Sequence, residues 1–200
     1  MIVTTNTTTQ GFGLKVFIGL YNAFAFGEWI DLPASSKDAS ELIAKTGRRI
    51  RDRYLSTYGQ YIEEYDVFDT DIECPIVRAL FGKLGESHWS YILRLSELEN
   101  AGIDIEDDNQ LETIAAYFAI VGENDAIENA HDNLCGVYEW LGTDDESGAK
   151  YAEDSFYETH DTDNVPMLRY INWHYYWSGD LRHNLSYGEF NGKFWLFHNH

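Results

Sequence analysis

KVFIGLY, at residues 15–21, is the stretch that decides how the chain begins to fold. Its β-branched and aromatic side chains predict a strand. The alternating segment EWIDL at residues 28–32 predicts a second strand, joined to the first by a loop over residues 22–27. Residues 64–69, EYDVFD, predict a third strand that returns to the first. The chain is therefore expected to open with a small sheet.

A helix is predicted between the second and third strands. Ser35 or Ser36 can cap a helix over residues 38–45, and Gly47 is expected to end it. The following residues 48–53, RRIRDR, form the one basic cluster of the chain. Such a cluster is either a solvated face or a counterweight to acidic residues, within the chain or in a dimer.

After Pro75 the apolar spacing becomes helical. Ser87 is expected to cap the second of the predicted helices, and Gly102 to end it. These helices cover residues 76–84, 88–100, 107 or 108–120, and 125–134.

The last part of the chain mixes helix and sheet. The acidic residues 144–148 lead into a helix predicted over residues 149–159, and Pro166 begins a further helix to residue 177. EFNGKFW at residues 189–195 predicts a tight hairpin, because Asn-Gly lies between aromatic residues. The expected class is α+β, built from small units in series.

Charge is the main pointer to function. The chain has a net charge of −20, and residues 95–168 hold twenty Asp and Glu residues against one cation, Lys150. So one-sided a charge opposes compaction through self-repulsion. The same tract contains seven aromatic residues within positions 117–157, whereas disordered acidic tails are poor in aromatics. The carboxylates are therefore expected on folded structure, at fixed positions.

This acidity excludes a general affinity for nucleic acid or for anionic membrane, and it favours a basic partner. Residues 1–13 are expected to be a flexible lead-in without the regions of a signal peptide, and the longest apolar run, residues 16–26, is too short to cross a bilayer. Cys74 and Cys135 imply no disulfide framework. The expected location is the cytoplasm.

The sequence contains few motifs that would indicate an enzyme or a metal site. The chain has no phosphate loop, dinucleotide fingerprint, nucleophile elbow or paired-histidine zinc motif. EF-hand spacing fails from Asp104 and from Asp144, because neither stretch has glycine at the sixth position. We therefore predict no catalytic residues, no cofactor and no metal. A hydrolase with an unseen carboxylate pair stays an alternative.

Two histidine-bearing groups are weaker metal candidates. His198 and His200 form a pair at the end of the sequence. A second cluster is a weak metal signal because no ligand residue from another part of the sequence is identified to complete it. That second cluster consists of Glu158, His160, Asp161 and Asp163. The aromatic residues 173–177, WHYYW, are expected to pack in a core, since no basic groove accompanies them for base stacking.

An ordered acidic surface can imitate DNA. B-form DNA carries one charge per ~1.7 Å, so an excess of nineteen charges matches about 32 Å of duplex, roughly one turn. Carboxylates three and four residues apart on a helix are neighbours, which suits a phosphate row. The predicted phosphate surrogates are Asp104, Glu106, Asp107, Asp108, Glu112, Glu123, Asp125, Glu128, Asp132, Glu139, Asp144, Asp145, Glu146, Glu153, Asp154, Glu158, Asp161 and Asp163.

Three segments resemble the ArdA-type antirestriction proteins. The first is VFIGLYN at residues 16–22 followed by GEWIDL at residues 27–32, which is similar to the family's opening strand and its Gly-x-Trp-x-x-Leu motif. The second is EEYDVFDTD at residues 63–71 with Pro75. The third is ENAHDNLCGVY at residues 128–138, followed by an acidic helix and the aromatic strand KFWLF at residues 193–197.

The resemblance implies a non-enzymatic DNA mimic, carried by phages and other mobile elements, that occupies the DNA-binding groove of type I restriction–modification enzymes. It also implies an elongated, curved homodimer with three small α+β domains. The expected divisions are residues 1–13, 14–72, 73–122 and 123–200. The apolar residues 114–120 and 134–141 would build the core and part of the dimer contact. An acidic module for another basic DNA-binding or antiphage protein stays the alternative.

Overall fold

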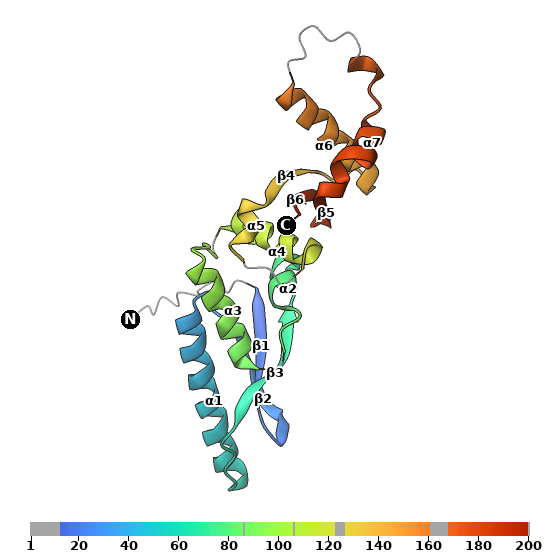
Figure 1. Ribbon diagram of the computed structural model, residues 1–200. Coiled ribbons are helices and arrows are strands. Elements are labelled where there is room, and N and C mark those ends of the chain that lie inside the picture. Colours follow the sequence, from blue (N-terminus) through green and yellow to red (C-terminus); the bar gives the residue numbers. More distant parts are fainter. Residues whose placement is uncertain (1–12, 86, 106, 123–126, 161–167, 200) are drawn as a thin grey trace, which may run out of the picture. The chain divides into compact units, whose positions relative to one another are not determined.

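The computed structural model describes residues 13–85, 87–105, 107–122, 127–160 and 168–199 (Figure 1). The chain groups into two units, Met1–Glu112 and Thr113–His200. Each unit contains its own three-stranded antiparallel sheet together with helices, so the predicted α+β class is confirmed. The finer division into three domains stays a prediction.

The first sheet consists of β1 (Leu14–Leu20), β2 (Ala23–Asp31) and β3 (Tyr65–Ile72) in the order β2-β1-β3. Strand β1 is the central strand and pairs antiparallel with both neighbours. All three predicted strands are present, and the third returns to the first, as expected.

The predicted loop over residues 22–27 is wrong. The turn between β1 and β2 contains only Tyr21 and Asn22, and strand β2 begins at Ala23. Asn22 has a φ of 64°, a left-handed conformation that Asn tolerates better than most residues. A tight hairpin therefore replaces the expected loop.

Helix α1 (Ser36–Tyr58) is much longer than predicted. Ser35 caps it, as expected, by accepting a hydrogen bond from the backbone N–H of Asp38 at 3.4 Å. The helix runs through Gly47 and the whole basic cluster, and it ends at Gly59, whose φ is 69°. The prediction that Gly47 ends the helix is wrong.

Gly47 serves close packing rather than helix termination. A Cβ atom built on Gly47 would lie 2.5 Å from Cδ2 of Tyr65 on β3. Gly47 is buried, as are its neighbours Thr46 and Ile50. The missing side chain therefore allows the helix backbone to approach the ring of Tyr65.

Two further helices follow β3 in the first unit. They are α2 (Pro75–Phe81) and α3 (His88–Asn100). Helix α3 lies beside α1, which packs against β1 and β2 (Figure 1). The carboxylate of Glu99 accepts hydrogen bonds from the backbone N–H, at 2.9 Å, and from the hydroxyl of Ser36. This contact fixes the end of α3 to the start of α1.

Asp66, rather than Ser87, accepts the hydrogen bond from the free backbone N–H at the start of α3. Ser87 occupies the N-cap position, but its side chain makes no capping hydrogen bond. Oδ1 of Asp66, on β3, accepts the backbone N–H of His88 at 2.7 Å and lies 2.6 Å from Nδ1 of the same residue. Asp66 is only 9% exposed, so this bond ties α3 to the sheet at a largely buried position.

The second unit begins within α4 (Asp108–Ile120), whose predicted bounds are confirmed. A short helix α5 (Asn129–Asp132) leads directly into strand β4 (Leu134–Glu139). Of the helix predicted over residues 125–134, only Asn129–Asp132 is helical, Leu134 belongs to β4, and residues 125 and 126 lie outside the described residues. The sequence pattern missed β4 because the helical and strand segments adjoin without a glycine or proline between them.

Strands β5 (Leu185–Phe190) and β6 (Lys193–His198) form the predicted hairpin, and the sheet order is β4-β6-β5. Asn191 and Gly192 have φ values of 53° and 76°. Two consecutive left-handed residues are what a two-residue hairpin turn of this type requires, so the Asn-Gly signal is confirmed.

Helix α6 (Asp144–Thr159) begins five residues earlier than predicted. The hydroxyl of Thr143 accepts a hydrogen bond from the backbone N–H of Glu146 at 3.2 Å and so provides the N-cap. The acidic residues 144–146 therefore form the first helical turn instead of a leader before it.

The helix predicted over residues 166–177 is broken in the part that the structure describes, which begins at residue 168. Asn172 interrupts it, since its side chain accepts the backbone N–H of Tyr175 at 3.1 Å and caps a new helix. The successive segments are η1 (Leu168–Tyr170), α7 (Trp173–Tyr176), the π-helical η2 (Trp177–Leu181) and η3 (Arg182–Asn184).

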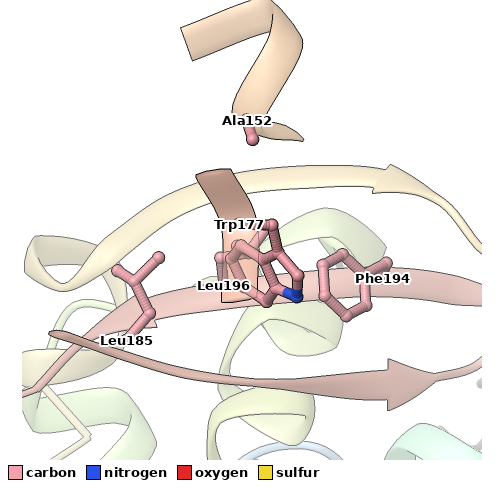
Figure 2. Close-up of a cluster of buried hydrophobic side chains, with 5 residues drawn as sticks. All are labelled: Ala152, Trp177, Leu185, Phe194 and Leu196. Carbon is pink, nitrogen blue, oxygen red and sulfur yellow. The ribbon is translucent and has the colours of Figure 1, made fainter. Parts of the chain in front are cut away.

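Trp177 is at the centre of a buried cluster in the second unit. Figure 2 shows its indole between the side chains of Leu196 and Phe194 on β6, with Ala152 of α6 above it. The indole centroid lies 6.1 Å from that of Phe194. Gly148 of α6 contacts the same indole, because a Cβ there would lie 2.1 Å from Cε2 of Trp177.

Among the described residues, no helix has both the length and the apolar character needed to cross a membrane.

Replacing Gly148 by Ala should destabilise the second unit by about 2–3 kcal/mol, because the added methyl overpacks the indole of Trp177. Urea unfolding followed by tryptophan fluorescence measures this. Gly179→Ala is the matched control, since a Cβ there meets only ordinary contact at 3.8 Å from Tyr175. Equal unfolding midpoints for the two variants would show that the close packing is not required.

Candidate functional site

Helix α6 carries the largest group of predicted site residues. Asp144, Asp145 and Glu146 occupy its first turn, and all three are exposed. Carboxylates at this end interact favourably with the helix dipole, each by about 0.3–1 kcal/mol. The acidic residues therefore stabilise the helix that displays them.

The second half of α6 adds three carboxylates. Glu153 and Asp154 are half-buried and both pair with Lys150, whose Nζ lies 3.3 Å from Glu153 Oε2 and 2.7 Å from Asp154 Oδ1. Glu158 is exposed and makes no ion pair with any cation in the described part of the chain. The positive charge of Lys150 is thus used within its own helix.

The opposite side of α6 faces the core. Its buried residues are small, namely Ser147, Gly148, Ala149 and Ala152. The hydroxyl of Ser147 accepts the backbone N–H of Leu141 at 3.0 Å. One face of the helix is therefore fixed by packing, while the acidic side chains project from the remaining surface.

A second group lies at the start of α4, in the first unit. Asp104 and Asp108 are exposed. Asp107 caps the helix, because its Oδ1 accepts the backbone N–H of Asn109 at 3.0 Å and its Oδ2 accepts the side-chain N–H of Gln110 at 3.0 Å. Its charge is therefore half-buried and already bonded.

Glu112 does not belong to an exposed acidic surface. It is only 6% exposed, within the buried stretch from Leu111 to Phe118 of α4. An imitation of phosphate requires an accessible carboxylate, so the predicted role of Glu112 is wrong. The helical spacing from Asp108 suggested an exposed position, but α4 is buried on nearly every side.

The remaining predicted residues are either exposed in the second unit or outside the described part of the chain. Glu128, Asp132 and Glu139 are exposed in the second unit. Arg182 approaches the exposed Asp145, with 3.8 Å between Nη1 and Oδ1. The predicted residues that lie outside the described part of the chain are Glu106, Glu123, Asp125, Asp161 and Asp163.

The basic cluster of residues 48–53 is bonded inside the first unit. Arg49 pairs with Glu28 on β2 at 2.6 Å. The guanidinium of Arg53 lies 4.9 Å from the ring centroid of Phe26, and that of Arg51 donates to the carbonyl of Glu63 at 3.2 Å. Within the described residues, Arg49 is the member of the cluster that balances a carboxylate, while Arg51 and Arg53 bond a carbonyl and an aromatic ring.

The calcium alternatives meet a geometric obstacle. Residues 144–155 and 108–115 are helical, whereas an EF-hand loop wraps around its ion. No group of three His, Cys, Asp or Glu side chains among the described residues is placed to hold a metal. His200, Asp161 and Asp163 lie outside those residues.

The aromatic residues 173–177 mostly pack, as predicted. Trp177 is fully buried, and the rings of Trp173 and Tyr176 lie 5.6 and 6.2 Å from that of Phe156 on α6. Tyr175 is the exception, with 73% of its surface exposed.

Sequence reasoning missed a groove beside the acidic helix. It has a volume of about 420 Å³ and lies between β4 and the second half of α6. Tyr138 and Tyr157 line it together with Asp154 and Glu158. The signals in the sequence were the Gly-x-Tyr spacing of Gly136 and Tyr138, and the position of a tyrosine between two carboxylates one helical turn apart.

Comparison of the chain with protein-family models, with curated proteins and with solved structures gives no match. The resemblance to antirestriction proteins therefore rests on the short motifs alone.

The thiol of Cys135, on β4, should react slowly with alkylating reagents. Burial raises the pKa of the Cys135 thiol to about 11. At about pH 8 its thiolate fraction should be about 100-fold below that of a thiol of ordinary pKa, and alkylation should slow accordingly. The measurement is the rate of iodoacetamide labelling of Cys135 in the Cys74→Ser variant, compared between the native protein and the protein unfolded in guanidinium. Native labelling within about tenfold of the unfolded rate would contradict the burial of Cys135.

Proposed function

We propose that this chain is a non-enzymatic antirestriction DNA mimic, which occupies the DNA-binding groove of type I restriction–modification enzymes. The observation that carries the proposal is α6, an ordered helix with four exposed carboxylates, of which Asp144, Glu146 and Glu158 make no ion pair with a described cation. The ArdA-type motifs supply the identity of the target.

The order of this surface matters energetically. A helix held by Gly148 and Trp177 loses little conformational entropy when it binds, unlike a flexible acidic tail. Lys and Arg residues in a DNA-binding groove would meet carboxylates at fixed positions, and opposite charge would steer the approach. Competition with DNA follows, because both ligands need the same cations.

The proposed surface excludes some predicted residues and keeps others. It comprises the exposed carboxylates of the second unit, which are Glu128, Asp132, Glu139 and the four of α6. Asp104 and Asp108 of the first unit are a separate group, and Asp107 is left out because its carboxylate caps α4. The homodimer that the motifs imply belongs to the same proposal, as does the cytoplasmic location predicted from the sequence.

Competition with DNA tests the proposal. The protein is titrated at low salt into a type I methyltransferase bound to fluorescent DNA, and anisotropy reports displacement. We expect displacement that weakens as salt rises, because at 0.1 M salt the attraction between exposed charges is largely screened beyond about 10 Å, and this distance shortens as salt is added. DNA that stays bound at micromolar excess of the protein would contradict the target, and capture of another basic DNA-binding protein would then favour the alternative module.

Charge variants test the surface itself. The α6 variant neutralises four exposed carboxylates: Asp144→Asn, Asp145→Asn, Glu146→Gln and Glu158→Gln. The control neutralises four exposed carboxylates of the first sheet and its border: Asp31→Asn, Asp69→Asn, Asp71→Asn and Glu73→Gln. With about 0.5 kcal/mol for each exposed charge pair, the α6 variant should displace DNA about 10- to 30-fold less well.

The control should keep its activity within about threefold, and so should Asp145→Asn alone, because the charge is distributed. Circular dichroism checks that each variant is folded. Equal losses in the α6 variant and the control would show that net charge, rather than the α6 surface, determines inhibition.

A further inference from the structure

The groove between β4 and α6 lies entirely within the second unit. The described residues that line it are Gly136, Val137 and Tyr138 from β4, and Asp154, Tyr157 and Glu158 from α6. Strand β4 is at the edge of its sheet, whose order is β4-β6-β5. The groove of about 420 Å³ is large enough for a long side chain.

Aromatic rings form much of its wall. The ring of Tyr138 lies over Gly136, where a Cβ would be 2.8 Å from Cε2 of the tyrosine. Tyr151 of α6 holds this ring from the side, at a centroid distance of 5.6 Å and an interplanar angle of 75°. Tyr157 is 45% exposed and its centroid lies 6.0 Å from that of Trp173. One fixed ring and one accessible ring thus line the groove.

The groove is electrostatically negative. Burial raises the pKa of Tyr138, and the charges of Asp154 and Glu158 raise this pKa further. A tyrosine phenol is neutral at neutral pH, and these effects keep Tyr138 neutral to more alkaline pH. Its oxygen can accept a hydrogen bond from a cation in the groove. Lys150 offsets the charge of Asp154 at 2.7 Å, while no described cation pairs with Glu158.

These features favour one kind of occupant. A cation gains from a carboxylate partner and from the face of an aromatic ring, and the gain is larger for a planar group that can stack and bond in the same plane. Lysine has a compact, strongly hydrated charge and makes less use of a ring.

We propose that this groove binds the guanidinium group of an arginine from a basic partner, with Glu158 as its ion-pair partner and Tyr157 as its stacking surface. The assignment of that arginine to a DNA-binding groove rests on the proposed function. The binding of a guanidinium in this groove does not rest on the proposed function. Such binding would add one specific contact to the distributed charge of α6.

Titration of the full chain with N-acetylarginine methylamide tests the inference, with NMR of labelled tyrosine rings as the readout. We expect saturable shifts of Tyr138 and Tyr157 with a dissociation constant of about a few millimolar. The citrulline analogue has the same shape without the charge and should bind at least about tenfold more weakly. The lysine analogue should bind more weakly than the arginine compound.

Three variants locate the site. Glu158→Gln should weaken arginine binding at least about fivefold, whereas Glu146→Gln, on the same helix but outside the groove, should leave it unchanged. Tyr157→Ala should weaken binding about threefold or more, and Tyr157→Phe should retain it because the ring is preserved.

Equal effects of Glu158→Gln and Glu146→Gln would overturn the inference, as would equal affinity for arginine and citrulline. So would titration without saturable shifts of the two tyrosines. No restriction enzyme takes part in this measurement, so its failure would leave the DNA-mimic proposal standing, and failure of DNA displacement would leave the groove standing.

Discussion

The contact between Gly148 and the indole of Trp177 is the constraint on which the second unit depends. It brings the backbone of α6 against the largest fully buried side chain, which also contacts β6 through Phe194. A helix seated so closely has one possible rotation about its axis, because any other would place a larger side chain against the indole. Packing of small residues on one side therefore decides which carboxylates face solvent on the other.

Local signals in the sequence were sufficient for several elements. Asn191 and Gly192 specify their hairpin through backbone preferences alone, and the Ser35 cap works through a hydrogen bond three residues away. Helix α4 was predicted with its bounds, since its start is a capping aspartate and its end precedes Gly122. In each case the responsible atoms lie within a few residues of one another.

Other features depend on partners distant in the chain. Gly47 resembles a helix stop until Tyr65 is known to lie against it, and Ser87 resembles a cap until Asp66 is known to occupy that role. The burial of Glu112 and the groove at Tyr138 likewise arise from packing between elements. Helical spacing identifies which residues share a face, but only tertiary structure decides whether that face is covered.

The uncompensated carboxylates of α6 have a consequence for how the protein responds to its ionic environment. Like charges held close together on a folded surface repel one another, and dissolved ions reduce that repulsion. The same ions reduce the attraction between α6 and a cationic groove. Salt also screens the favourable interaction of Asp144 and Glu146 with the helix dipole. Ionic strength therefore acts on folding through two opposed effects, whereas its effect on binding has one direction, a weakening.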